Sequence, residues 1–456
     1  MQSSNKHVEE FLQSVCNEIK CKSVHKSVAR ELENHIEDQK TEYVNKGFDE
    51  ETALKKAIKE MGNPASVGRE LDKTHRPKTE WSILAITSVL VILSGTIQFL
   101  FSGTSQDTSY MFSHFLLYSL IGIAAFLIVY FFDYTLFSTY PKLIYTGIFI
   151  MTLLVFVFSN KPYGGFIYMY YAVLLFIPAF AGIVYSLKDK GYLGIVISGL
   201  FYLSGAFLCL ISPSVISLLL LTISAFTIIT TSIAKGFFKV NKKIGFAIVY
   251  VPTLLSFIIL IIKAHEYISK IFMIYLYPGF DPKGAGYLYL MLRNTVSQAR
   301  LIGSSLNENT IIPLWNTDFT LTYIIARWGY VAGIAITALM AILIVRMFII
   351  VSKQKNSYSF LLSLSSTIAI TAQIVLYVLS NISIIAPIQI TLPFFSFGAY
   401  SFITNMILLG LLLSVYRRSH LISDRFKGTQ HKKPVLSFEN GKLTIDFGLL
   451  KPKKLQ

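Results

Sequence analysis

Ten long apolar runs constrain the fold of this chain more than any other feature of its sequence. A helix of about 20 residues crosses the hydrocarbon core of a bilayer. Hydrophobic residues make up 53% of the 456 residues, whereas charged residues make up only 14%, against about 25% in a soluble domain. We therefore predict an all-α membrane protein with about ten transmembrane helices. The runs lie near residues 81–102, 110–132, 143–159, 164–187, 191–211, 214–234, 244–263, 321–351, 359–382 and 396–416.

Residues 1–78 have a different character and precede the first apolar run. They contain as many acidic as basic residues, and their apolar residues recur at helical spacing. Asp49 is a typical N-cap, and Gly47 and Gly62 are typical of helix ends. This segment is therefore predicted to be a small helical domain in front of a membrane domain that spans residues 79–420.

The lysines and arginines of the membrane domain follow the alternation of its connections. Every second connection is basic, whereas 103–109 carries no base and 160–163 carries one. Because positive loops stay in the cytoplasm, both ends of the chain are predicted to be cytoplasmic. This pattern accounts for the net charge of +16 without nucleic-acid binding. The bases are Lys142, Lys188, Lys190, Lys235, Lys239, Lys242, Lys243, Arg346, Lys353 and Lys355.

The last segment, residues 421–456, follows the last apolar run. Two runs of alternating polar and apolar residues flank Asn440 and Gly441. Asn-Gly between such runs is typical of a two-residue hairpin turn. A short β-hairpin is therefore predicted in a cytoplasmic tail, and no catalytic pattern is visible in it.

Residues 264–320 form one long connection, which the alternation places outside. Long loops that are not linkers are usually functional. The loop carries four of the acidic residues that follow position 78: Glu266, Asp281, Glu308 and Asp318. No Asp or Glu lies within an apolar run, which argues against a proton-coupled transporter, because such proteins usually need an ionisable group inside the membrane. Carboxylate chemistry is therefore expected at the outer face.

Asp318 stands where the long loop meets the eighth apolar run. A carboxylate at an apolar boundary has a raised pKa, which suits a general base. The alternative is that Thr317 or Asp318 caps the helix that follows. Asp281 precedes Pro282 in FDPKGAGY, and this pattern favours a turn over a catalytic role.

The bases of the loop are candidate ligands for a phosphate or pyrophosphate. Arg293 and Arg300 are seven residues apart, and Lys283 precedes them. Contact with lipid headgroups, or plain solvation, is the alternative. Arg327 is predicted to lie about two turns into the eighth span, where a charge is costly. It either lines a wet cavity or extends to the surface.

Three motifs in this order resemble those of the FtsW/RodA/SpoVE family. The first is FDPKGAGY at 280–287, which is similar to the family's DP-x-G-x-GY element, and the second is IPLWNTDF at 312–319, which is similar to its LPEPHTDF element. The third, at 392–418, is LPFFSFGAYSFITNMILLGLLLSVYRR, which is similar to its LPF-x-SYGG-SS element. The resemblance covers roughly residues 80–420. Its motif positions here are Asp281, Pro282, Gly284, Gly286, Tyr287, Asn316, Asp318, Pro393, Ser396 and Gly398.

The resemblance implies an inverting peptidoglycan glycosyltransferase of the bacterial cytoplasmic membrane that acts with a class B penicillin-binding protein in division, cell shape or sporulation. Asp318 would be the general base on the 4-hydroxyl of the acceptor GlcNAc, with lipid II as donor and acceptor. Undecaprenyl pyrophosphate would leave, stabilised by cations. Lys283, Arg293, Arg300, Arg327 and Asn316 are the candidate substrate ligands. A divalent cation would serve the same purpose, although no metal motif is visible.

The chain also departs from the family pattern. Asn316 replaces the His before TDF, Leu288 replaces the Gln after GY, and SQARLIGSS at 297–305 lacks the lysine of the Gly-rich run. Residues 1–78 resemble the permease prefix domain of some Gram-positive membrane proteins, which implies regulation or docking. Two other functions stay open: a non-catalytic scaffold that binds lipid II or a partner, and a flippase of lipid-linked precursors.

Overall fold

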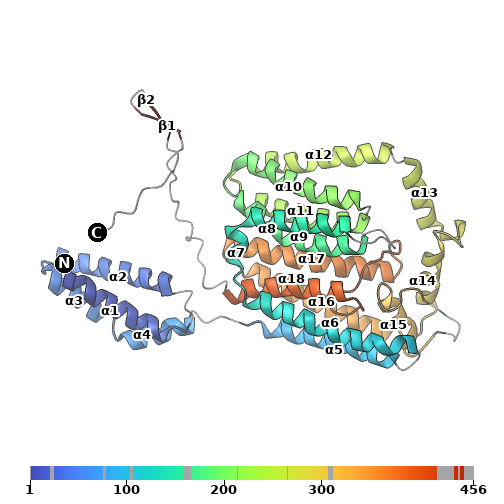
Figure 1. Ribbon diagram of the computed structural model, residues 1–456, viewed down its shortest axis with the longest axis horizontal. Coiled ribbons are helices and arrows are strands. Elements are labelled where there is room, and N and C mark those ends of the chain that lie inside the picture. The colour runs from blue at the N-terminus through green and yellow to red at the C-terminus, as the bar shows by residue number, and fades with distance from the viewer. Residues whose placement is uncertain are drawn as a thin grey trace.

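The computed structural model describes residues 2–20, 25–74, 79–102, 106–158, 166–212, 214–263, 265–306, 312–418, 436–439 and 442–445. Four helices at the N-terminus form a bundle of their own: α1 (Gln2–Glu18), α2 (His25–Asn45), α3 (Glu50–Glu60) and α4 (Pro64–Thr74) (Figure 1). The backbone N–H of Lys20 donates to the buried Asp72 carboxylate at 3.0 Å and joins α1 to α4. The core of this bundle consists of Phe11, Val15, Ile19, Val28, Leu32, Ile36, Leu54 and Ala57.

The predicted ends of the N-terminal helices follow from local backbone chemistry. The Asp49 carboxylate accepts a hydrogen bond from the Thr52 N–H at 3.0 Å, which confirms the predicted N-cap of α3. Gly47 and Gly62 have φ angles of 91° and 83°. Glycine adopts this left-handed conformation without steric cost, so these residues end α2 and α3 where the sequence predicts.

Long apolar helices make up the rest of the structure. Within the described residues, nine are long and apolar enough to cross a membrane, and α9 is a shorter apolar helix over its described side chains, Tyr170–Ser186. The chain is therefore a multi-pass membrane protein. The helices are α5 (Trp81–Ser102), α6 (Gln106–Phe131), α8 (Pro141–Phe158), α9 (Phe166–Ser186), α10 (Gly191–Ile211), α11 (Val215–Ala234), α12 (Lys242–Lys263), α16 (Tyr330–Ser352), α17 (Ser357–Asn381) and α18 (Ala399–Arg418).

Burial separates the central helices from the peripheral ones. In the most apolar 18-residue stretch of α17 and of α18, 72% is buried inside the protein, whereas in that of α12 only 6% is buried. Figure 1 shows the same order, with α17 and α18 in the interior and α12 along one edge. Helix α9 packs against α8, α11 and α17. The apolar face of α12 suits contact with lipid, because a helix at the edge of a bundle buries its apolar residues in the bilayer.

Helices α6 and α18 approach closely because glycines face the contact. A Cβ added to Gly122 would lie 2.5 Å from Cδ1 of Phe402, and one added to Gly410 would lie 3.1 Å from the Phe126 carbonyl oxygen. Small residues allow the close packing that holds helices together in lipid. This contact is relevant to the site because the segment that precedes α18 is part of it.

The eighth apolar run, residues 321–351, was predicted to be a single span, but the structure divides it. It forms a short helix, α15 (Thr320–Trp328), and the spanning helix α16, separated by Gly329 with φ 93°. A Cβ on Gly329 would lie 2.5 Å from the Leu301 carbonyl oxygen, so only glycine fits this turn. Arg327 therefore does not lie within a span: it is exposed, in the last turn of α15. The predicted position two turns into a span is wrong, whereas the exposure of Arg327 fits the alternative that its side chain extends to the surface.

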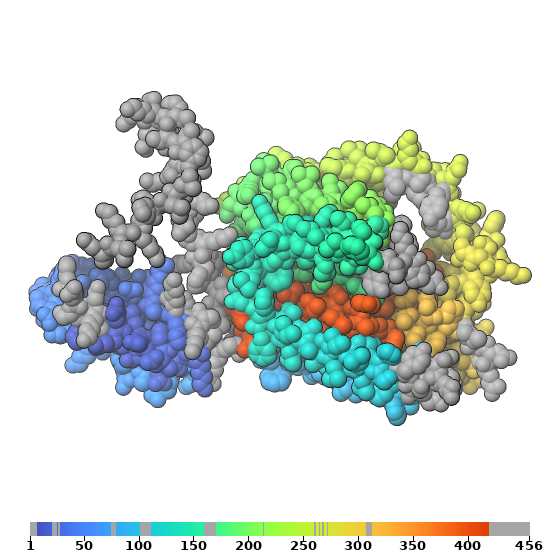
Figure 2. All heavy atoms as spheres, viewed as in Figure 1, coloured from blue at the N-terminus to red at the C-terminus, as the bar shows by residue number. Residues whose placement is uncertain are grey.

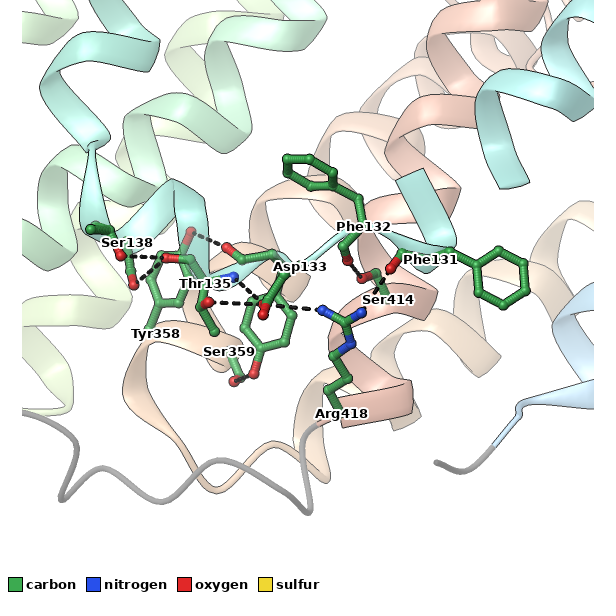
Figure 3. Close-up of polar contacts among 11 residues, drawn as sticks. Phe131, Phe132, Asp133, Thr135, Ser138, Tyr358, Ser359, Ser414 and Arg418 are labelled. Carbon is green, nitrogen blue, oxygen red and sulfur yellow. Dashed lines mark hydrogen bonds and ion pairs between the residues drawn. The ribbon is translucent and has the colours of Figure 1, made fainter. Parts of the chain in front are cut away.

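Polar contacts join three helices at the end of the bundle where α6, α17 and α18 meet the short helix α7 (Thr135–Thr139) (Figure 3). Arg418 pairs with Asp133 at 3.1 Å and donates to the Phe131 carbonyl oxygen at 2.7 Å. Ser414 donates to the Phe132 carbonyl oxygen at 2.8 Å, and the Tyr134 hydroxyl lies 3.0 Å from that of Ser359. The last turn of α18 is thereby fixed to the α6–α7 turn.

Two short strands follow the helical part of the chain, β1 (Leu436–Glu439) and β2 (Lys442–Ile445). They pair antiparallel, with Glu439 opposite Lys442. The turn residues proposed for the hairpin, Asn440 and Gly441, lie outside the described residues, as does Glu308 of the long loop.

Candidate functional site

The long connection between α12 and α16 is largely helical. It contains α13 (His265–Leu276), η2 (Pro278–Phe280), α14 (Tyr287–Ser297) and α15, and these lie at the end of the bundle away from the N-terminus (Figure 1). Helix α13 projects there in the space-filling view (Figure 2). The Tyr289 hydroxyl donates to the Ser383 carbonyl oxygen at 2.9 Å, and the Tyr275 hydroxyl donates to the Ile384 carbonyl oxygen. The segment is therefore tied to the connection between α17 and α18.

Asp281 stabilises a turn between η2 and α14. Its carboxylate accepts a hydrogen bond from the Ala285 N–H at 2.9 Å, and its carbonyl oxygen accepts one from the Gly286 N–H at 3.0 Å. A Cβ on Gly286 would lie 2.1 Å from the Pro278 carbonyl oxygen. Pro282 and Tyr287 flank this turn and are exposed. Glu266 and Asp281 also line an open groove of about 460 Å³ beside α13.

The loop that carries Asp318 is held by one strained residue. Leu314 has a φ of 52°, a left-handed conformation that costs a non-glycine residue about 1–2 kcal/mol. Its carbonyl oxygen accepts hydrogen bonds from the N–H groups of Thr317, Asp318 and Phe319, at 3.0–3.1 Å. Ser383 and Phe394, in the neighbouring segments, also have positive φ angles. Strained backbone of this kind gathers at functional sites.

The motif before α18 is hydrogen-bonded to the loop that carries Asp318. The Phe397 N–H donates to the Asn316 carbonyl oxygen at 2.9 Å, and the Ser396 hydroxyl lies 3.3 Å from that of Thr320. Pro393 and Ser396 are buried in this motif. Two segments that resemble family motifs, about 80 residues apart in sequence, therefore form one structural unit.

Helix α6 completes this unit on its other side. The side-chain amide of Asn316 donates to the Met111 sulfur at 3.8 Å, and the Gly398 N–H donates to the Tyr118 hydroxyl at 3.5 Å. Asn316 therefore anchors the loop through both its carbonyl oxygen and its side chain. Its proposed role as a substrate ligand stays a prediction.

The Asp318 carboxylate does not cap the helix that follows. The N-cap of α15 is Phe319, without a side-chain hydrogen bond, so the cap alternative is wrong. Asp318 is partly buried, and desolvation raises the pKa of its carboxyl from 3.8 to about 6. No cation among the described residues offsets this effect of burial on the pKa of Asp318. A carboxylate with such a pKa suits proton transfer near neutral pH.

Three tyrosines surround the Asp318 region of the bundle. Tyr170 and Tyr171 of α9 and Tyr377 of α17 lie within electrostatic range of its charge. Tyr170 donates to Oε1 of Gln373 at 2.8 Å, and Nε2 of Gln373 donates to Oδ1 of Asn405 at 3.1 Å. Beneath Asp318 the bundle interior is thus polar but uncharged, which suits a carboxylate that alternates between charge states.

The predicted basic ligands are not gathered around Asp318. Lys283, Arg293, Arg300 and Arg327 are all exposed. Helix α14 ends at Ser297, so Arg293 lies on this helix and Arg300 lies beyond its end. The Arg300 carbonyl oxygen accepts a hydrogen bond from the Tyr330 N–H at 3.0 Å and stays close to the start of α16. These residues offer a basic exposed surface but no preformed anion clamp.

Two residues of the site carry no local sequence signal. Asn381 donates to the Asp318 carbonyl oxygen at 3.0 Å, and the Tyr377 hydroxyl accepts a hydrogen bond from the Leu321 N–H at 3.0 Å. Both lie in an apolar helix about 60 residues further along the chain. A polar Asn near the end of the apolar run at 359–382 does not by itself point to this site.

Comparison with known proteins identifies the membrane domain. Residues 76–421 match the family described as FtsW/RodA/SpoVE, cell cycle protein. The chain belongs to this family. A probable peptidoglycan glycosyltransferase FtsW of Borreliella burgdorferi is 28% identical over 174 residues, which are 37% of this chain and 47% of that protein. Stage V sporulation protein E of Bacillus subtilis is 28% identical over 172 residues, 36% of this chain and 46% of that protein. The chain thus spans about half or less of these relatives' length.

Solved structures agree with the FtsW/RodA/SpoVE assignment at the level of the fold. A chain from a study of polymerization and crosslinking by a peptidoglycan synthase complex superposes with a TM-score of 0.61 at 18% identity, over 76% of this chain and 99% of that one. The rod shape determining protein RodA of Thermus thermophilus superposes with a TM-score of 0.52 at 15% identity, over 75% of this chain and 97% of that one.

Proposed function

We propose that this protein is a peptidoglycan glycosyltransferase that polymerises lipid II at the outer face of the bacterial cytoplasmic membrane. The observation that carries the proposal is Asp318: a partly buried carboxylate with a raised pKa, without a cap or an ion pair among the described residues. It lies where two of the family's motifs are hydrogen-bonded together. Relatives named as probable peptidoglycan glycosyltransferases support the same activity.

In the proposed reaction, the Asp318 carboxylate takes the proton of the acceptor's GlcNAc 4-hydroxyl. The oxygen then attacks the anomeric carbon of the donor, and the bond to undecaprenyl pyrophosphate breaks with inversion. Asp318 returns its proton to solvent before the next cycle. General-base catalysis of this kind contributes about 10²–10⁴-fold to the rate. A pKa of about 6 leaves the carboxylate mostly ionised at pH 7 yet basic enough to accept a proton.

The leaving pyrophosphate needs positive charge near it. The proposed sources of this positive charge are Lys283, Arg293 and Arg300, because they are exposed on the same segment as Asp318. Within the residues that the structure covers, no three His, Cys, Asp or Glu side chains gather to hold a metal ion. A divalent cation held by the pyrophosphate itself would serve the same purpose.

The proposed topology places both termini in the cytoplasm and the Asp318 loop outside. The basic connections between the spans support it. A class B penicillin-binding protein is the proposed partner, because a similar fold occurs in a peptidoglycan synthase complex. Residues 1–78 are proposed to be a cytoplasmic prefix domain with a regulatory or docking role, since they form a core of their own.

The test is polymer formation from labelled lipid II by the full chain, purified with a class B penicillin-binding protein from the same bacterium in lipid nanodiscs. Asp318→Ala and Asp318→Asn are compared with wild type. Glu266→Gln is the matched control, because Glu266 is an exposed acid on the same outer segment. We expect polymer from wild type and Glu266→Gln, and at least about 100-fold less from both Asp318 variants.

Equal polymer from wild type and Asp318→Ala would exclude Asp318 as the base. Lipid II binding without polymer in every variant would favour the scaffold. Transfer of lipid II across the bilayer of vesicles without polymer would favour the flippase.

A further inference from the structure

Asn381 makes hydrogen bonds to the Asp318 carbonyl oxygen and to Thr322, on either side of the start of α15. It is the last residue of α17 and is fully buried. Its Nδ2 donates to the Asp318 carbonyl oxygen at 3.0 Å and to the Tyr377 carbonyl oxygen at 3.1 Å. Its Oδ1 accepts from the Thr322 N–H at 3.1 Å and lies 3.0 Å from the Thr322 hydroxyl. The amide group of Asn381 is thus fully used, by Tyr377 of its own helix, by Asp318 just before α15 and by Thr322 in the first turn of α15.

The first N–H groups of a helix have no partner within the helix, and a side chain just before the helix usually accepts them. Asp318 is placed for that task, yet its carboxylate does not perform it. Tyr377 accepts the Leu321 N–H and Asn381 accepts the Thr322 N–H instead. Tyr377 and Asn381 are one turn apart on α17, so one face of this helix caps α15 from outside.

This arrangement explains why the Asp318 carboxylate is free. A carboxylate that accepts backbone N–H groups is stabilised in its charged form and becomes a weak base. With the Leu321 and Thr322 N–H groups bound to α17, neither of them draws the Asp318 carboxylate back onto its own helix. The bond from Asn381 to the Asp318 carbonyl oxygen also fixes the peptide from which the side chain extends.

We propose that Asn381 is a positioning residue for Asp318, with Tyr377 as its partner: together they cap α15 in place of Asp318 and keep its carboxylate available to the acceptor hydroxyl. This inference rests on the proposed function. It adds a role for two buried residues of α17 that lie outside the motifs of the sequence.

The test measures the protonation of Asp318 independently of polymer formation. Dicyclohexylcarbodiimide labels protonated carboxyl groups, and mass spectrometry quantifies the modified Asp318 in the full chain in nanodiscs across pH 4–8. In wild type we expect labelling to fall as pH rises through about 6. In Asn381→Ala the freed Thr322 N–H attracts the carboxylate, so the midpoint of labelling moves to lower pH.

The matched control is Asn356→Ala. Asn356 is a buried Asn that caps α17 itself, through the N–H groups of Tyr358 and Ser359, at the other end of the same helix. It is about 37 Å from Asn381 at 1.5 Å per residue. We expect the labelling midpoint of Asn356→Ala to equal that of wild type, even where its thermal stability falls.

Tyr377→Phe is a second variant, in case Asn381→Ala does not fold. It removes only the hydroxyl, keeps the ring volume and leaves the Leu321 N–H unpaired. Its labelling midpoint is expected to move in the same direction. In the polymerisation assay, both variants are expected to lower kcat on the order of 10- to 100-fold with little change in KM.

An unchanged labelling midpoint in both variants would overturn the inference, whatever the assay shows. A shifted midpoint in a protein that makes no polymer from lipid II would support the placement of Asp318 and refute the proposed function instead. The two failures are therefore distinguishable.

Discussion

At the scale of single residues, environment rather than residue type gives Asp318 its character. Asp281 lies in the same connection between α12 and α16, yet its carboxylate accepts a hydrogen bond from the Ala285 N–H at 2.9 Å. Asp318 has neither such a donor nor a neighbouring cation among the described residues, and burial raises its pKa to about 6. One carboxylate therefore stabilises a turn, while the other is free to accept a proton.

The rate of polymer formation should follow the ionisation of Asp318. A general base must be deprotonated, so the rate should rise with pH, reach half its plateau near pH 6 and level off above pH 7. The measurement is the initial rate at low lipid II concentration between pH 5 and 8, with protein stability checked at each pH. A rate independent of pH over this range would contradict the assignment of Asp318 as the base.

Asp318→Asn should stabilise the protein while it removes activity. Because the folded-state pKa is raised from 3.8 to about 6, the folded protein holds a proton in this interval that the unfolded chain releases. Stability therefore falls as pH rises from 3.8 through 6, and the deficit is complete above pH 7. A two-unit shift corresponds to about 3 kcal/mol, and less for this partly exposed side chain.

The measurement for Asp318→Asn is the midpoint of thermal unfolding in detergent at pH 8 and at pH 4. The variant should exceed wild type at pH 8, and the difference should be much smaller at pH 4, where Asp318 is protonated in the folded protein. A variant that is less stable than wild type at pH 8 would show that the charged carboxylate is stabilised in the fold, contrary to its raised pKa.

At the scale of helices, α18 connects the two ends of the bundle. The motif that is bonded to the Asp318 loop lies just before its first turn, and Arg418 in its last turn is bonded to the α6–α7 turn. Between these ends, α18 packs closely on α6 over Gly122 and Gly410. The position of the motif before α18, relative to α6, therefore depends on how closely α18 packs against α6.

Gly122→Ala should destabilise the α6–α18 contact. The new methyl group would lie 2.5 Å from the Phe402 ring, so the helices must separate or the ring must turn, at a cost of about 1–3 kcal/mol. Gly147→Ala is the control, because no atom lies within 4 Å of its added Cβ. The thermal midpoint should fall for Gly122→Ala only. Equal midpoints for the two variants would mean that the contact is looser than described.

The Asp133–Arg418 pair should contribute modestly to seating α18. Side-chain exposures of 48% and 23% limit an ion pair to about 0.2–1 kcal/mol, because solvent screens it. A double-mutant cycle with Asp133→Asn and Arg418→Ala should give a coupling energy in this range. The bond from Arg418 to the Phe131 carbonyl oxygen is lost in Arg418→Ala alone, so this variant should be the less stable single mutant. Additive effects of the two changes would exclude the coupling.

At the scale of the whole molecule, the chain consists of two units with separate cores. The core of α1 to α4 shares no residue with the core of the membrane helices. Its polar surface suits water, whereas the exposed surface of α12 and α8 is apolar. A protein built in this way can vary one unit without loss of the other.

Deletion of residues 2–74 should leave the membrane helices folded. Because no residue of the N-terminal core packs into the second core, the thermal midpoint of the remaining bundle should stay within a few degrees of the full chain. The measurement is thermal unfolding in detergent, detected by the exposure of the thiol of Cys209, which is buried in α10 in the folded protein. A large loss of stability would reveal a contact between the units that matters to both.

The sequence by itself determined the elements and their class. The bounds predicted for the apolar runs agree with α5, α10 and α11 to within about one residue, because apolar length and tight turns are local properties. It failed where a helix had to break: Gly329 divides the eighth run because the Leu301 carbonyl oxygen packs against it, a contact that no local pattern contains. Arg327 was misplaced for the same reason.

The tertiary structure alone decided which role of Asp318 is available. From the sequence, cap and base were both open, since each needs only a carboxylate before a helix. The choice depends on Tyr377 and Asn381, which reach the first N–H groups of α15 from a helix about 60 residues away. Hydrogen bonds between distant segments form only once the chain has folded. Asp318 could therefore be identified from the sequence, whereas the absence of a capping role for its carboxylate could not.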